Sequence, residues 1–191
     1  MAEKIKPICV LALVAAIISG LVIVVYNLTY VDTSNIVTDK QAAAVTAIYG
    51  GTKDDYSVVP ASDYTEKLTA AGLTSVSKVI KKNDGSMAIE CLVKGYKSGF
   101  DIMVGVKDNK VAGVAIVSVG EETPGLGTKT NDPDFLSRFN DKSGKVTIVK
   151  SAPSADNEVQ GITSATLSSR GVATAVNNAL EAYKLIGGEA Q

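Results

Sequence analysis

The chain has 191 residues, of which 46% are apolar and 20% charged, and its net charge is −1, values that suit one globular domain with an additional segment. We expect no nucleic-acid partner, because there is neither a basic excess nor the aromatic content of a base-stacking platform. The lack of histidine excludes serine–histidine hydrolysis and removes the commonest zinc ligand, so we expect no metal site. Cys9 and Cys91 indicate neither a metal cluster nor a disulfide, and we interpret both as small buried hydrophobes.

An apolar run from Ile8 to Val25 opens the chain. At about 1.5 Å per residue in a helix, this run nearly crosses a hydrocarbon core of about 30 Å. Lys4 and Lys6 precede it, and the positive-inside rule then places the N-terminus in the cytoplasm and the remainder across the membrane. A cleaved signal peptide is the alternative, but its apolar region would span only about 7–15 residues and end at a small-residue site.

Three parts of the chain follow from this pattern. Residues 1–28 are predicted to be the cytoplasmic N-terminus and a single transmembrane anchor, residues 29–39 a polar linker, and residues 40–191 an extracytoplasmic domain. The resulting protein would be a cell-membrane protein with one span.

Two short helices are predicted at the start of this domain. The first covers Lys40–Tyr49, with Thr38 or Asp39 as its cap and Gly50–Gly51 as its end. The second covers Tyr64–Ala71.

β-branched, alternating segments separated by turns occupy the chain between Thr74 and Val119, and they predict an antiparallel sheet. In one of these segments Ile102, Val104 and Val106 share an apolar face, while the opposite face is mixed. The predicted strands are Thr74–Ile80, Ser86–Gly95, Phe100–Val106 and Lys110–Val119.

A short helix ending at Phe139 follows, with Asn131 or Asp132 as its cap and an early proline. A strand is predicted over Lys145–Lys150, and apolar residues at three- and four-residue spacing predict an amphipathic helix over Ser168–Ile186. The fold class is therefore α+β, an antiparallel sheet flanked by helices after an N-terminal transmembrane helix.

Five hydroxyl side chains gather just before the last helix, in the segment "GITSATLSSRG": Thr163, Ser164, Thr166, Ser168 and Ser169. Capping a helix needs only one or two of them. Free amides, the positive end of the helix dipole and several hydroxyls favour a bound phosphate, to which Arg170 would add charge. An ordinary helix start rich in serine and threonine is the alternative.

At these residues the sequence resembles the FMN-binding domain family of ion-pumping flavoprotein complexes, whose motif is approximately Asp-x-x-Ser/Thr-Gly-Ala-Thr-x-Ser/Thr. The resemblance implies FMN joined covalently through its phosphate to Thr166 by a separate flavin transferase. The sequence departs from the motif at Gln160, where aspartate is expected, and at Ser164, where glycine is usual; a positive φ there would strain a serine. The matching positions are Thr163, Ser164, Ala165, Thr166 and Ser168, and the resemblance implies that the first four of them bind the cofactor.

The string "ETPGLG", residues 122–127, is a second feature that resembles the family. A type II turn accounts for Pro124 and Gly125 alone. The resemblance implies that the other four residues bind the flavin: Glu122, Thr123, Leu126 and Gly127. The segment Lys94–Val106 also resembles the family, and we give it only a structural role.

Within the family, the anchor, the small domain and the chain length resemble the RnfG branch. That resemblance implies an electron-transfer subunit of an ion-translocating ferredoxin:NAD oxidoreductase (Rnf) complex, a translocase in which this subunit is not catalytic alone. Its partners would be the other membrane and peripheral subunits, with ferredoxin and NAD reached only indirectly. The alternatives are the NqrC branch of sodium-pumping NADH:quinone reductases, a tethered domain that binds a ligand reversibly, and a structural assembly subunit.

Overall fold

The computed structural model describes residues 2–30 and 35–187, with side chains described from residue 9 onward. The chain divides into two compact units, residues 1–33 and 34–191, and each is described by itself. Residues 31–34 of the predicted linker lie outside the described residues, as do the side chains of Lys4 and Lys6 on which the predicted orientation depends.

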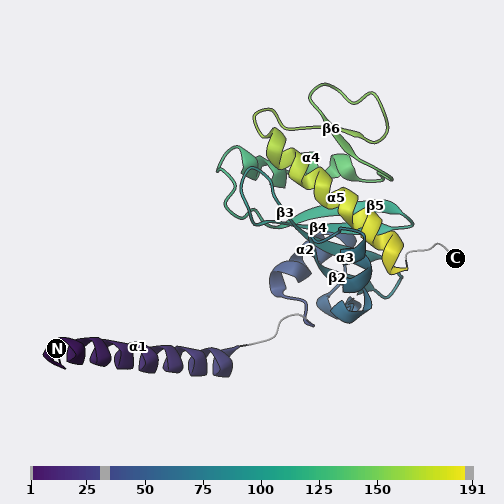
Figure 1. Cartoon of the computed structure of the whole chain (residues 1–191). Coiled ribbons are helices and arrows are strands. Elements are labelled where there is room, and N and C mark those ends of the chain that lie inside the picture. The colour runs from purple at the N-terminus through teal and green to yellow at the C-terminus, as the bar shows by residue number, and fades with distance from the viewer. Residues whose placement is uncertain (1, 31–34, 188–191) are drawn as a thin grey trace. The chain divides into compact units, whose positions relative to one another are not determined.

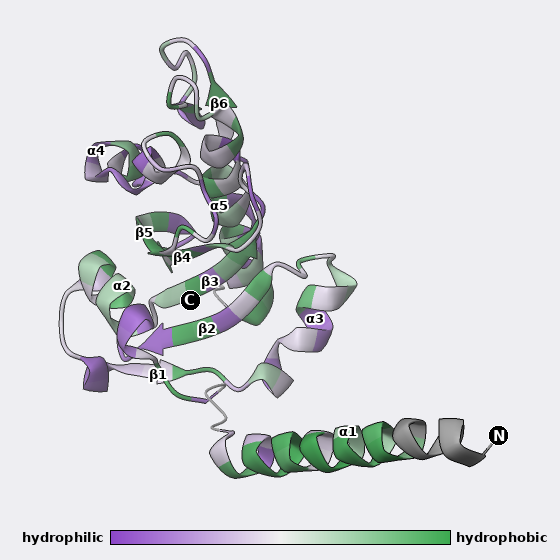
Figure 2. Ribbon diagram, turned by 90° about the vertical axis from the view of Figure 1, so that its left-hand side faces the viewer, coloured by the Kyte–Doolittle hydropathy of each residue, from purple (hydrophilic) through white to green (hydrophobic). Residues whose placement is uncertain are grey.

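The first unit is one helix, α1 (Ala2–Thr29). Its segment Cys9–Thr29 has 21 residues and a mean hydropathy of 2.8, so by length and composition it is able to cross a membrane. Figure 2 shows the apolar colouring along most of this helix. Cys9 is exposed on α1, so its predicted burial is wrong; Cys91, in the second unit, is buried as predicted.

The second unit contains the predicted antiparallel sheet, with helices on both faces, which confirms the α+β class (Figure 1). Its five strands lie in chain order and each pairs antiparallel with the next. Four of them match the predicted strands, whereas β1 was not predicted because three residues carry too little periodicity. The strands are β1 (Tyr56–Val58), β2 (Val76–Lys82), β3 (Met87–Val93), β4 (Phe100–Lys107) and β5 (Lys110–Ser118).

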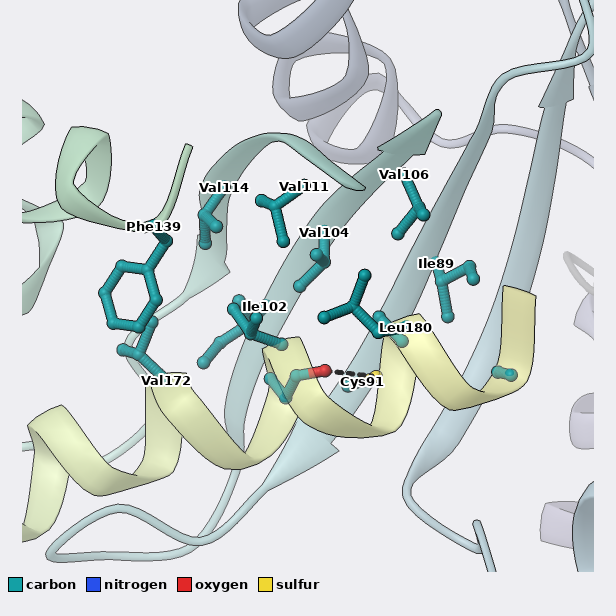
Figure 3. Close-up of a cluster of buried hydrophobic side chains, with 14 of the residues drawn as sticks. Ile89, Cys91, Ile102, Val104, Val106, Val111, Val114, Phe139, Val172 and Leu180 are labelled. Atoms are coloured by element: carbon teal, nitrogen blue, oxygen red, sulfur yellow. Dashed lines mark hydrogen bonds between the residues drawn. The ribbon is translucent and has the colours of Figure 1, made fainter. Parts of the chain in front are cut away.

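The main core lies between this sheet and the last helix, α5 (Thr166–Ile186). Ile102, Val104 and Val106 of β4 are fully buried on this face, as their alternation predicted, and Figure 3 shows them together above α5. Burying each such side chain contributes about 1.5–3 kcal/mol. Beside them, the Cys91 thiol donates to the Ala175 carbonyl at 3.7 Å.

The opposite face is covered by α2 (Asp39–Tyr49). Thr38 is its cap and forms a capping box with Gln41, and Gly50 ends the helix with φ of 67°, as the sequence predicted. Tyr49 fixes the helix to the sheet, because its hydroxyl donates to the carbonyls of Met87 and Val106 at 3.0 and 3.1 Å. The smaller elements nearby are η1 (Lys53–Asp55), η2 (Ala61–Asp63) and α3 (Thr65–Ala70), the second predicted helix.

After β5 the chain forms η3 (Gly127–Asn131), α4 (Pro133–Leu136) and η4 (Ser137–Phe139). Asp132 caps α4, as one of the two predicted caps. The predicted strand over 145–150 is shorter, β6 (Thr147–Val149), and it pairs in parallel with the unpredicted β7 (Glu158–Gln160) in a separate two-stranded sheet. The chain then enters α5, which begins two residues before the predicted start.

Candidate functional site

The first turn of α5 leaves its amides open. Ala165 occupies the cap position and offers no side-chain cap, and the first helical hydrogen bond runs from the Ser169 amide to the Ala165 carbonyl at 2.9 Å. Within the described chain, the amides of Thr166, Leu167 and Ser168 reach no protein acceptor. These donors, at the positive end of a 21-residue helix, favour an anion.

The five hydroxyls divide into two groups. Ser168 and Ser169 are buried and bonded to protein: Ser168 Oγ donates to Glu122 Oε2 at 2.6 Å, and Ser169 Oγ donates to the Ala165 carbonyl at 2.9 Å. The other three, those of Thr163, Ser164 and Thr166, have no hydrogen-bond partner among the described residues. Thr166 is half-buried and therefore presents a free hydroxyl at the start of the helix.

Ser164 has φ of 67°, the left-handed region in which glycine is favoured. The family motif that the sequence resembles has glycine at this position. Because the backbone is left-handed here, a serine in place of glycine is strained. The strain sits two residues before Thr166, in the loop that leads into α5.

The "ETPGLG" segment forms the predicted type II turn. The Leu126 amide donates to the Thr123 carbonyl at 3.1 Å, and Gly125 has φ of 75°. Thr128 closes the turn from the far side, accepting the Gly125 amide on its hydroxyl at 2.9 Å. The turn is thus held from both ends and presents Leu126, which is 43% exposed, toward solvent.

This turn and the first turn of α5 enclose a cavity of about 490 Å³. Six of the eight predicted binding residues line it: Thr123, Leu126, Gly127, Ser164, Ala165 and Thr166. The structure adds three residues, Tyr96, Leu167 and Ser168. The sequence analysis gave the segment that contains Tyr96 only a structural role. An aromatic residue in the short, glycine-containing segment "KGYKSG" could have indicated a loop side chain that is accessible to a ligand.

A second hollow of about 380 Å³ adjoins the first, because Thr166 lines both. It contains two cationic side chains, Lys150 and Arg170, and Thr163, while Ser164 and Thr166 line both hollows. The free Thr166 hydroxyl therefore stands where an apolar cavity meets a cationic one. A larger hollow of about 730 Å³, between α2, β5 and η4, is lined by none of the predicted site residues.

Glu122, the remaining predicted binding residue, is not among the residues that line the cavity. It is buried, and its carboxylate turns toward the Ser168 hydroxyl and the Lys97 amide. Gln160, the other departure from the motif, lies exposed in β7.

The region that contains this site is similar to known proteins. Residues 95–181 match the model of the FMN-binding domain. Over 142 residues the chain is 27% identical to the G subunit of the Na(+)-translocating ferredoxin:NAD(+) oxidoreductase complex of Acetobacterium woodii, a match that covers 68% of each chain. Over 90 residues it is 38% identical to the G subunit of the proton-translocating ferredoxin:NAD(+) oxidoreductase complex of Clostridium ljungdahlii, covering 46% of this chain and 48% of that protein.

Among solved structures, the C subunit of the Na(+)-translocating NADH-quinone reductase from Parabacteroides distasonis aligns with a TM-score of 0.49 and 23% identity, over 65% of this chain and 68% of that one. The matched family region runs from the loop before β4 into α5 and includes every predicted site residue. Somewhat less than half of the chain thus matches the FMN-binding domain family, and the chain is similar to the G subunits of ion-translocating ferredoxin:NAD(+) oxidoreductases.

Proposed function

We propose that this protein is the FMN-carrying electron-transfer subunit of a membrane-bound, ion-translocating ferredoxin:NAD oxidoreductase complex, with FMN joined through its phosphate to Thr166 Oγ1. The FMN-binding domain match and the two G-subunit relatives support the cofactor and the complex. The observation that carries the attachment point is the unpartnered, half-buried Thr166 hydroxyl, which lies beside free helix amides and lines both hollows.

The residues present suit a flavin nucleotide. A cavity of about 490 Å³ lies in the usual range for small-molecule sites, and Tyr96, Leu126 and Leu167 give it apolar walls for a flat ring. The free α5 amides suit a phosphate, and Lys150 and Arg170 add positive charge in the adjoining hollow. Bound FMN supplies the electron-carrying chemistry, and the chain holds and orients it.

A covalent bond suits a domain outside the cytoplasm, where a released cofactor would be diluted. In forming the phosphoester, Thr166 Oγ1 would bond to the phosphorus next to the flavin in a flavin adenine dinucleotide donor and lose its proton, while the phosphoanhydride bond breaks and AMP leaves with that proton. A flavin transferase would catalyse this step. The remaining predicted residues, Thr163, Ser164 and Ala165, shape the loop that presents the Thr166 hydroxyl.

The proposed arrangement places α1 in the membrane, the N-terminus in the cytoplasm and the FMN-binding domain outside it. A topology reporter fused after Gln191 tests this orientation, and we expect it to be active only outside the cytoplasm. Activity inside the cytoplasm would contradict the proposed orientation.

Intact-mass spectrometry of protein purified from its own host tests the attachment. We expect a mass increase of one FMN less one water, and a fluorescent band that survives denaturing electrophoresis. Thr166→Ala should abolish both and Thr166→Ser should keep them, because serine retains the hydroxyl. Thr174→Ala is the matched control, since Thr174 is exposed further along the same helix. An unmodified wild-type chain would instead favour a tethered domain that binds its ligand reversibly.

A further inference from the structure

Glu122 joins three segments that are distant in sequence. Its side chain is 5% exposed, and both carboxylate oxygens are engaged. Oε2 accepts the Ser168 hydroxyl at 2.6 Å, and Oε1 accepts the Lys97 backbone amide at 3.0 Å. One carboxylate thus connects the loop after β5 with the loop between β3 and β4 and with the first turn of α5.

The backbone packs closely around this carboxylate. A Cβ atom added at Gly95 would collide with Glu122 Oε1, and one added at Gly127 would collide with Oε2. Glycine at these two positions leaves room for a buried glutamate between the two loops. The carboxylate therefore fills a space that the surrounding chain leaves open for it.

The three connected segments are the walls of the 490 Å³ cavity. The β3–β4 loop contributes Tyr96, the β5 loop contributes Thr123 and Leu126, and α5 contributes Thr166. We propose that Glu122 is a positioning residue, which holds these walls in register through the Lys97 amide and the Ser168 hydroxyl without touching the flavin. This inference rests on the proposed function of the cavity as the flavin site.

The chemistry of the two contacts sets the expected effect of substitutions. Hydrogen bonds to a carboxylate are short and strong, and truncating the side chain leaves buried donors unsatisfied. Within the described residues, the Lys97 amide has no acceptor other than Glu122. Glutamine keeps an oxygen for this amide, and its NH₂ group can donate to the Ser168 hydroxyl, which also accepts.

The first measurement needs no flavin. Hydrogen exchange of the Lys97 amide is followed by NMR in the full-length chain in detergent. Glu122→Ala should accelerate this exchange about tenfold or more, the effect of losing one buried hydrogen bond, while Glu122→Gln should recover most of the protection. Glu121→Ala is the matched control, because Glu121 is the exposed neighbour of the same residue type.

The second measurement follows the flavin in chain co-expressed with its transferase. Glu122→Ala should slow FMN attachment about 10- to 100-fold and change the visible circular dichroism of any attached flavin, because a displaced wall misplaces the acceptor hydroxyl. Glu122→Gln should recover both, and Glu121→Ala should change neither. Ser168→Ala breaks one contact and keeps the carboxylate, so it should give an intermediate effect even where Glu122→Ala fails to fold.

The two proposals fail in different ways. A wild-type chain without FMN would contradict the proposed function, while the Lys97 exchange rates would still decide whether Glu122 holds the walls. The positioning role alone would be overturned if the wild type carries FMN and Glu122→Ala leaves three quantities unchanged: the exchange rate of the Lys97 amide, the rate of FMN attachment and the visible circular dichroism. A failure of Glu122→Gln to recover either signal would also overturn it.

Discussion

Replacing Ser164 with glycine should stabilise the second unit of the chain, residues 34–191. Ser164 has φ of 67°, and its hydroxyl has no partner in the described chain, so the substitution removes strain and loses no hydrogen bond. Placing an L-residue in the left-handed region costs about 1–2 kcal/mol. Glycine itself lowers the free energy of unfolding by about 0.5–1 kcal/mol, because it loses more conformational freedom on folding than serine does. The midpoints of the two ranges differ by about 0.7 kcal/mol, which is the gain we expect.

Urea and thermal unfolding of the full chain in detergent, followed by tyrosine fluorescence, measure this gain. For a domain of this size we expect the midpoint temperature to rise by about 1–4 °C. Ser164→Ala removes the hydroxyl and keeps the Cβ, so it should leave the strain in place. Ser143→Gly, at an exposed serine outside the positive-φ positions, should show only the entropic cost of glycine.

Two results would refute this reasoning about Ser164. The first is a Ser164→Gly variant no more stable than wild type, which would mean that the left-handed backbone costs the serine nothing. The second is an equal gain in Ser143→Gly, which would mean that the effect does not depend on φ.

Two further predictions concern the sheet. The pKa of Asp101 is raised from 3.8 to about 7, mainly by burial and then by the charge of Glu90 and a hydrogen bond to it. The contribution of Asp101 to stability is therefore complete below pH 3.8 and is lost as the pH rises through 7. Asp101→Asn should therefore gain stability relative to wild type between pH 4 and pH 8, and parallel urea-unfolding profiles of the two proteins would contradict this. Ile102→Ala should lower the free energy of unfolding by about 2–5 kcal/mol, because Ile102 is fully buried against α5; a loss below 1 kcal/mol in urea unfolding would show that the site collapses around the gap.

The sequence correctly predicted the elements that are determined by residues close together in the chain. The alternation of Ile102, Val104 and Val106 gave the correct face of β4, and Thr38 and Gly50 gave the correct ends of α2. Caps, turns and alternation act between neighbours in sequence, so a single sequence contains them in full.

Features that depend on distant contacts were not predicted. The strands β1 and β7 have three residues each, and they exist because a partner strand lies beside them. The inward turn of Glu122 depends on Ser168, 46 residues away in the chain. The place of Tyr96 in the cavity likewise depends on the packing of its loop against α5. The motifs therefore predicted two segments that line one cavity, and tertiary contacts decided which of their residues face it.

The start of α5 differs from an ordinary capped helix in a way that favours a bound anion. A missing side-chain cap costs a helix about 0.5–2 kcal/mol. This helix has five hydroxyls within reach of its first turn, yet Ser168 and Ser169 are committed to buried contacts and no side chain caps the first amides in the described chain. Capping residues were available in the sequence and the fold does not use them as caps. Such a start is favourable when an anion satisfies the amides, which is what the proposed FMN phosphate would do.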